Sequence, residues 1–245
     1  MSTPFQEGYQ YGKDQFLKDR KDLLILYYIN QLEEEKTESE VILGLPGDTK
    51  EKHFESLRWA IDNNVRSIRM HQSIMLVGTD MASKVTRKKY DLITKFRTVP
   101  GAVGNYEILG TKHPIAEVEE IIIGSSTLSQ KDYIDCRVMD LFIQTFYNNY
   151  LFEEVFALLK SIGVSTFDCI VYIKNHPELY SSGVKEIIKD FISATIDDLY
   201  DTLEEAQQSV LSPDIIVKYI EGKLGYNELL TNTERLFSKF DDSRD

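Results

Sequence analysis

The sequence has few cysteines and no long hydrophobic run. Its two cysteines, Cys136 and Cys169, lie far apart and match no spacing typical of a zinc or iron–sulfur site, and nothing indicates an oxidising compartment. No hydrophobic run approaches the about 20 residues that cross a bilayer. The N-terminal stretch lacks the apolar core of a secretory signal. We therefore expect a cytoplasmic protein with no membrane contact.

Basic residues are also in the minority, since 28 lysines and arginines face 40 aspartates and glutamates, for a net charge of −12. A negative chain repels phosphate backbones, so we expect no nucleic-acid partner. The sequence contains neither a GxGxxG nor a Walker motif. Its histidines, at positions 53, 71, 113 and 176, form no pair at metal-binding spacing, and we interpret His71 as a structural residue.

The hydrophobic pattern near the N-terminal third predicts a strand–helix–strand unit. The apolar run of residues 41–43 predicts a strand that is buried on both faces. Asp48 or Thr49 then caps a helix that ends at residues 63–64, and residues 65–76 form a second strand. A βαβ unit of this kind favours two parallel, adjacent strands.

The rest of the chain is predicted to be mostly helical. We expect a long loop with short elements over residues 81–110, where Pro100 and three glycines interrupt the pattern. From residue 115 onward we expect helices, the longest of them over residues 130–163 with Ser129 as its cap. Three further helices are expected after residues that commonly begin helices, namely Ser165, Pro177 and Pro213.

The stretch Gly44-Leu45-Pro46-Gly47 follows the first predicted strand and admits two interpretations. It can be a tight turn, in which glycine supplies a positive φ and proline fixes a bend. It can also be a ligand platform at the carboxyl end of a parallel strand, where missing side chains let a flat ligand approach the backbone. Asp48 disfavours a phosphate at the start of the next helix, so an uncharged or cationic group fits better.

Four blocks of the sequence, in collinear order over roughly residues 30–175, resemble radical S-adenosylmethionine enzymes, especially the group that often carries a cobalamin-binding domain. The first block resembles their fifth strand, the second their sixth strand and the turn after it, the third a basic-aromatic stretch, and the fourth their C-terminal helical segment. In this order the blocks are SEVILGLPGDTKEKHFESL, IRMHQSIMLVGTDM, RKKYDLITKFRTVPGAVGNY and EVEEIIIGSSTLSQKDYIDCRVMDLFIQTFYNN.

The resemblance implies a partial TIM-like barrel. In that family a [4Fe-4S] cluster reduces S-adenosylmethionine, and the resulting radical abstracts hydrogen from the substrate. Strands five and six help to hold the adenosyl group. One set of residues would lie against the adenine or shape the turn beside it: Ile42, Gly44, Leu45, Pro46 and Gly47. A second pair, Met75 and Leu76, would pack on the other side of the base.

The sequence departs from that family in two ways. It has no Cys-x3-Cys-x2-Cys loop to bind the cluster, and Glu40 stands where the family often has a glycine. We therefore expect the C-terminal portion of such an enzyme, which contributes adenosyl-contacting strands and substrate-side helices but performs no radical chemistry alone. The implied partner is a second chain with the cysteine loop, and the complete enzyme can also use cobalamin. The alternative is a non-catalytic helical interaction or adaptor protein derived from such an enzyme.

The predicted fold class is α/β, with a partial TIM-like barrel reduced to a βαβ unit and a mostly helical C-terminal region. The predicted segments are residues 1–37 with a helix over 22–36, residues 38–112 with strands five and six, and residues 113–245. A two-stranded parallel sheet leaves its edges uncovered. We therefore expect residues 115–245 to carry most of the stability, and residues 38–80 to self-associate or to need a partner.

Three further groups of residues have a structural interpretation that we prefer. The basic run over residues 84–97 can bind a phosphate or an acidic partner, but a solvated face is favoured. Glu117, Glu119 and Glu120 resemble catalytic carboxylates, yet we expect them on a solvated helix turn. The aromatic residues over 133–156 are expected to pack in the core.

Overall fold

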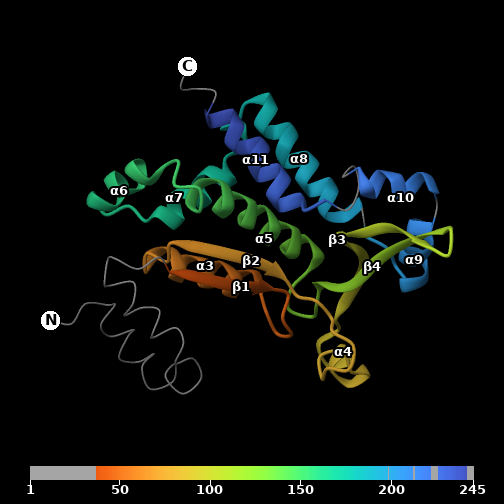
Figure 1. Ribbon diagram of the computed structural model, residues 1–245. Helices are drawn as coiled ribbons and strands as arrows, with labels where there is room; N and C mark the ends of the chain where they lie inside the picture. The colour runs from red at the N-terminus through yellow and green to blue at the C-terminus, as the bar shows by residue number, and fades with distance from the viewer. Residues whose placement is uncertain (1–36, 198, 212, 222–225, 242–245) are drawn as a thin grey trace.

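The first described elements form a βαβ unit. The computed structural model describes residues 37–241 except 198, 212 and 222–225. The helix predicted over residues 22–36 therefore lies outside the described residues. Strands β1 (Glu38–Leu43) and β2 (Ser67–Gln72) pair in parallel, and α3 (Lys50–Asp62) connects them (Figure 1). Thr49 caps α3 by accepting the backbone N–H of Lys52 at 3.2 Å. The predicted strand–helix–strand order and the parallel pairing are confirmed.

The two faces of the β1–β2 sheet differ in what covers them. Residues that alternate along the strands point to opposite faces. The side chains of Leu43, Ile68 and Met70 are buried on the helix side, where α3 and α5 pack. The other face is open, and its side chains are exposed: Glu38, Glu40, Ile42, Arg69 and His71. The prediction of a strand buried on both faces is therefore wrong for Ile42.

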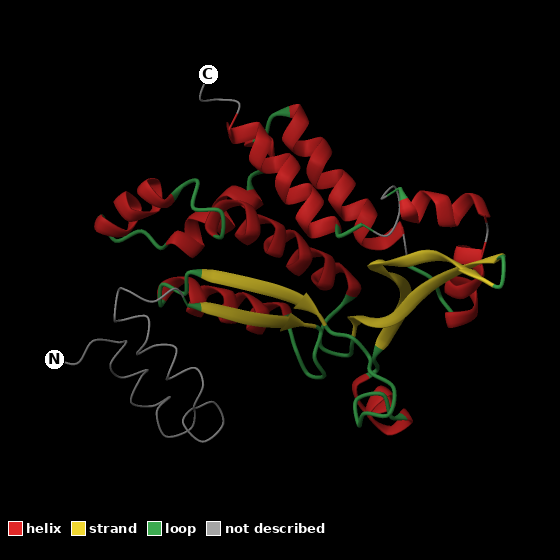
Figure 2. Cartoon of the chain, in the orientation of Figure 1, coloured by secondary structure: helices red, strands yellow, loops and turns green. Residues whose placement is uncertain are grey.

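A long antiparallel hairpin follows, where the sequence predicts a loop and a helix. After the short helix α4 (Lys84–Tyr90), β3 (Ile93–Ile108) pairs with β4 (Thr111–Gly124). The residues at the tip, Leu109 and Gly110, have φ of 53° and 77°, as a two-residue hairpin turn requires. The predicted loop over residues 81–110 and the predicted helix from residue 115 are both wrong. Figure 2 shows this hairpin as a sheet separate from β1–β2.

Beyond the hairpin the chain is helical. α5 (Gln130–Phe142) begins after Ser129, which accepts the backbone N–H of Asp132 at 3.1 Å, so this predicted cap is confirmed. The single helix predicted over residues 130–163 is wrong, because α5 runs into a π-helical turn, η1 (Ile143–Tyr147), and then breaks. Tyr150 has φ of 57° at the break, before α6 (Glu153–Ser161).

More helices complete the chain than the three predicted after residue 165. Ser165 caps α7 (Thr166–Asn175), and Pro177 begins a 3-10 turn, η2 (Pro177–Leu179). Then come α8 (Ser182–Asp197), α9 (Leu203–Leu211), α10 (Pro213–Ile220) and α11 (Glu228–Asp241). In Figure 1, α8 and α11 lie above α5, whereas α9 and α10 lie beside the hairpin.

The main hydrophobic core joins the βαβ unit to the helices. It combines Leu57 of α3 and Ile68 of β2 with Phe142 of α5, Phe167 of α7 and Phe191 of α8. The predicted core position of the aromatic residues over 133–156 is confirmed for Phe146, Phe152 and Phe156, which are members or neighbours of this core. It is wrong for Tyr150, which is 41% exposed. The fold is mixed α/β with two small sheets, and the described residues form no closed barrel.

No helix within the described part of the chain is by itself long and apolar enough to cross a membrane. The helices α6 and α7 together have the length and apolar composition of a membrane-spanning segment, but they meet at a bend of 113°.

Candidate functional site

The turn after β1 is held by hydrogen bonds within the chain. The backbone N–H of Asp48 donates to the carbonyl of Leu45 at 2.9 Å, which closes a turn with Pro46 and Gly47 at its centre. Gly47 has φ of 82°, the value that favours glycine in the third position of a type II turn. Lys52 Nζ donates to the Gly47 carbonyl at 3.0 Å. The tight-turn interpretation therefore accounts for these residues.

Gly44 is required by a close approach between two segments. Its φ is 93°, and a Cβ added there would lie 3.2 Å from the carbonyl oxygen of Ile122 in β4. The space that the missing side chain leaves is thus occupied by the hairpin. Gly44 is buried, so a ligand has no access to its backbone in this arrangement.

The predicted adenosyl-contacting residues divide into exposed and buried ones. Ile42, Leu45 and Leu76 are 44%, 42% and 60% exposed near the carboxyl ends of the two parallel strands. Met75 is only 3% exposed, and its N–H donates to the carbonyl of Glu120 at 2.7 Å. Pro46 and Gly47 are partly buried in the turn. The structure therefore offers three apolar side chains to a ligand at this end of the sheet.

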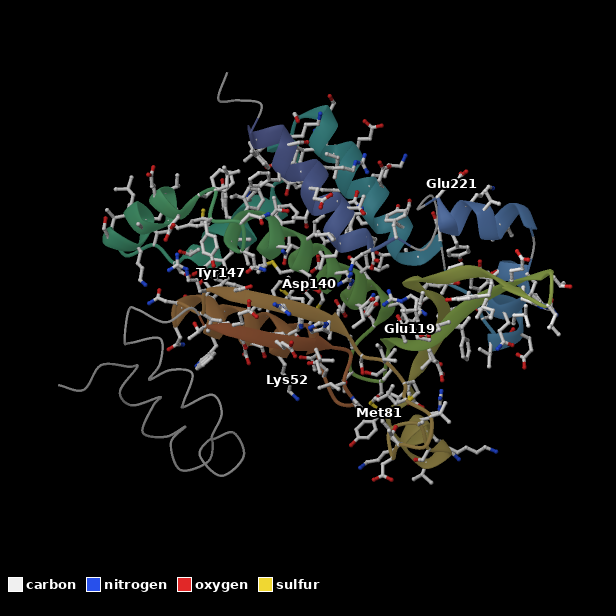
Figure 3. The ribbon with its side chains drawn as sticks, viewed as in Figure 1. Lys52, Met81, Glu119, Asp140, Tyr147 and Glu221 are labelled. Carbon is white, nitrogen blue, oxygen red and sulfur yellow. The ribbon has the colours of Figure 1, made fainter. Side chains whose placement is uncertain are left out.

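A hollow lies beside the outer edge of β1, and we name it the β1 hollow. Its volume is about 660 Å³, and its walls are β1 from residue 39 to 42, the turn of residues 45–48 and one stripe of α3. That stripe consists of Lys52, His53, Ser56, Trp59 and Ala60, at the spacing of one helix face. Figure 3 shows Lys52 on the side of the sheet where β1 forms the edge.

A buried network of charged and polar side chains extends inward from this wall, and no sequence pattern indicates it. His53 Nε2 lies 2.9 Å from Asp140 Oδ1, and both side chains are fully buried. Arg137 donates to Asp140 at 3.2 Å and to Glu228 of α11 at 2.8 Å. Figure 3 shows Asp140 between α5 and the parallel sheet. His53 and Asp140 are far apart in the sequence, so no local pattern could have paired them.

An ion pair and a histidine–carboxylate contact also lie on the open face of the sheet. Arg69 lies 2.9 Å from Glu38, and His71 Nε2 lies 3.8 Å from Glu40. His71 is exposed on this face rather than packed in the core. Glu40, which stands in place of the family's glycine, also points to this face.

Three members of the basic run, Arg87, Lys95 and Arg97, pair with acids of the hairpin and its neighbours. Arg87 donates to both carboxylate oxygens of Glu120, at 2.5 and 2.7 Å, and Arg97 donates to Glu119 at 2.7 Å. Lys95 pairs with Asp201. The prediction that Glu117, Glu119 and Glu120 lie on a helix turn is wrong, because all three lie on β4. Glu117 is exposed, as expected, whereas the side chains of Glu119 and Glu120 are only 13% exposed.

The cysteines lie in two different helices. Cys136 of α5 is buried, and this burial raises the pKa of its thiol. Cys169 of α7 is partly buried, which also raises its thiol pKa. Among the described residues, no three His, Cys, Asp or Glu side chains gather in a way that could hold a metal ion.

Comparison with known proteins gave no assignment. No protein-family model matches the chain, and the search of curated proteins found no match.

Proposed function

We propose that this chain contributes the C-terminal, adenosyl-contacting part of a radical S-adenosylmethionine enzyme. The proposal rests on the four collinear sequence blocks, and one structural observation supports it. The turn of residues 44–47 and the segment after β2 lie at the carboxyl ends of two parallel strands, where α/β folds bind their ligands. Ile42, Leu45 and Leu76 place exposed apolar surface at this end, which suits the flat face of a purine.

The residues of this chain do not fit the iron–sulfur cluster of such an enzyme. A [4Fe-4S] cluster is held mainly by cysteine thiolates. This chain has two cysteines, in different helices, and burial raises the pKa of both thiols and so opposes thiolate formation. We therefore assign no step at the cluster to this chain, and the cluster and any cobalamin would belong to a partner chain.

A binding experiment tests the adenosyl site. S-adenosylmethionine is added to the chain, and saturation-transfer NMR detects contact with its adenine protons. We expect contact with the parent chain and loss of contact in Ile42→Lys, since a lysine would remove apolar surface at the site. Ile115→Lys is the matched control, because Ile115 is 47% exposed on the distant hairpin. Equal signals from the two variants would contradict the assignment of Ile42.

A second experiment tests the partner. The DNA next to the gene is searched for a reading frame with Cys-x3-Cys-x2-Cys, and that frame is co-expressed with this chain. We expect a complex with iron–sulfur absorbance that cleaves S-adenosylmethionine. A partner that forms its cluster and cleaves S-adenosylmethionine equally well without this chain would contradict the proposal.

The second candidate function is a non-catalytic interaction protein. It is favoured by an exposed apolar stripe on α6 and its C-cap, formed by Val155, Leu158 and Ile162, which are 50%, 64% and 68% exposed. Absence of adenosyl contact in the NMR experiment, together with absence of a cysteine-loop frame, would favour this function over the first.

A further inference from the structure

The two outer edges of the parallel sheet differ in whether their backbone N–H and carbonyl groups have partners. On β2, the side chain of Asn148 pairs with both backbone groups of Ile68: its Oδ1 accepts the N–H at 3.0 Å and its Nδ2 donates to the carbonyl at 2.8 Å. Further along, Ile74 forms a bridge with Ile121 of β4. This bridge uses the Ser73 carbonyl and the Met75 N–H, which have the parity that faces β1, so the outer edge of β2 is closed by Asn148 at Ile68.

The pairing of Asn148 with Ile68 shows to which side the backbone N–H and carbonyl groups of β1 point. Ile68 points its N–H and carbonyl away from β1, and alternate residues of a strand point these groups to opposite sides. The register places Ser39 opposite Ile68, so Ser39, Val41 and Leu43 direct their groups to β2. The bond from the Ser73 N–H to the Leu43 carbonyl, at 2.9 Å, agrees with this parity. Glu38, Glu40 and Ile42 therefore point their backbone groups outward.

Among the described residues, the outward groups of β1 have no partner along most of the strand. At its end, Gly44 N–H donates to Asp48 Oδ2 at 3.3 Å, which closes the edge there. Between Glu38 and Ile42, no partner for the outward groups is found within residues 37–241 of the described chain. An open edge of this kind is a template for another strand.

We propose that the outer edge of β1 binds an extended segment of a second protein, in which apolar and basic residues alternate. A strand added there would point alternate side chains into the β1 hollow, against Trp59 and Ala60 of α3. The intervening side chains would lie beside Glu38 and Glu40 on the open face, where lysine or arginine is favoured across strands.

The charge at this edge also argues against a second copy of the chain. Both partners of such a dimer would bring Glu38, Glu40 and Glu55 to the joint, and the whole chain carries a net charge of −12. Like charges at a joint weaken association. The inference needs no enzymatic role for this chain, so it stands apart from the proposed function.

A peptide experiment tests the inference. The probe is an eight-residue peptide of alternating valine and lysine, and a valine–glutamate peptide is its charge control. Trp59 is the only tryptophan and lines the hollow, so its fluorescence reports occupancy. Amide hydrogen exchange measured by NMR reports the edge itself. With free peptide at about nine times Kd, we expect the amides of Glu40 and Ile42 to exchange roughly tenfold more slowly.

Charge-reversed variants make the test specific. In Glu38→Lys/Glu40→Lys we expect the preference to invert, so that the valine–glutamate peptide binds better. The control Glu186→Lys/Glu234→Lys changes the same net charge on exposed positions of α8 and α11 and should keep the parent's preference.

Four results would overturn the inference. The first two are protection of the outward amides by neither peptide, and equal protection by both. The third is slow exchange of these amides in the chain alone at low concentration, which would mean that the chain covers its own edge. The fourth is protection that rises with protein concentration in the absence of peptide, which would identify a second copy as the occupant.

Discussion

Arg137 lies between two buried carboxylates, those of Asp140 and Glu228. Its removal would leave Asp140 with His53 alone at 2.9 Å and Glu228 with the more distant Arg97 at 3.9 Å. We expect Arg137→Met to lower the free energy of unfolding by about 3–5 kcal/mol, the usual cost of breaking a buried pair. Urea denaturation measures this loss. The control is Arg235→Met, whose pair with Asp190 is about half exposed and is worth about 0–1 kcal/mol. Equal losses in the two variants would show that burial does not decide the effect.

We expect Glu120 to make the stability of the folded chain depend on pH in acid. The hydrogen bonds from Arg87 and Thr94 lower the pKa of this carboxyl below its ordinary value of 4.5. The unfolded chain therefore binds a proton more readily than the folded chain, so this contribution is present above about pH 4.5 and is lost as pH falls through the folded-state pKa. We expect Glu120→Gln to flatten the dependence of unfolding free energy on pH below 4.5.

The companion variant Arg87→Met serves as the check on this cause. It removes the first donor to Glu120, so most of the acid sensitivity should disappear with it, and adding Glu120→Gln to it should change little more. A full additional effect of Glu120→Gln in that background would assign the sensitivity to another group.

At the scale of elements, the βαβ unit could be predicted because each of its signals is local. The apolar run of residues 41–43, the cap at Thr49 and the stop at residues 63–64 each follow from neighbours in the sequence. The hairpin of β3 and β4 could not be predicted, because Pro100 and Gly101 suggest a loop. In the structure these two residues lie at an irregularity in the strand register between Thr98 and Val103.

The candidate site shows the same limit. The turn at residues 44–47 can be predicted because its signals are local in the sequence. The segments that pack around this turn are distant in the sequence and cannot be predicted in the same way. Ile122 occupies the space beside Gly44, and β4 covers Met75, whereas the sequence pattern suggests a helix in place of β4. The β-branched residues over 115–123 favour a strand, and this is the signal that could have corrected the prediction.

Asn148 provides a prediction for the outer edge of β2. Replacing it with alanine leaves the N–H and carbonyl of Ile68 without their partners, which costs about 1–3 kcal/mol when such groups stay buried. We expect Asn148→Ala to speed exchange of the Ile68 amide more than that of other β2 amides. The neighbouring exposed Asn149→Ala is the control. Unchanged exchange at Ile68 would mean that another group protects this edge.

At the scale of the whole molecule, the core crosses the boundary that the sequence suggested at residue 113. Leu57 of α3 packs in the same core as Phe142 and Phe191. We therefore expect Leu57→Ala to destabilise the entire chain by about 2–5 kcal/mol. Trp59 fluorescence and far-UV circular dichroism should report one coincident transition. Leu158→Ala, at an exposed position, should stay within about 0.5 kcal/mol of the parent.

Two separate transitions would contradict this expectation. They would instead support the prediction from the sequence that residues 115–245 hold most of the stability by themselves.

The side chain of Asn148 has a consequence for stoichiometry. It closes the outer edge of β2 at Ile68, whereas the outward groups of β1 between Glu38 and Ile42 have no partner among the described residues. A strand that joins β2 would first have to displace Asn148, and a strand that joins β1 would not. Fibre growth needs an edge on each side of every subunit. Asn148 therefore opposes growth of the sheet beyond one added strand per chain.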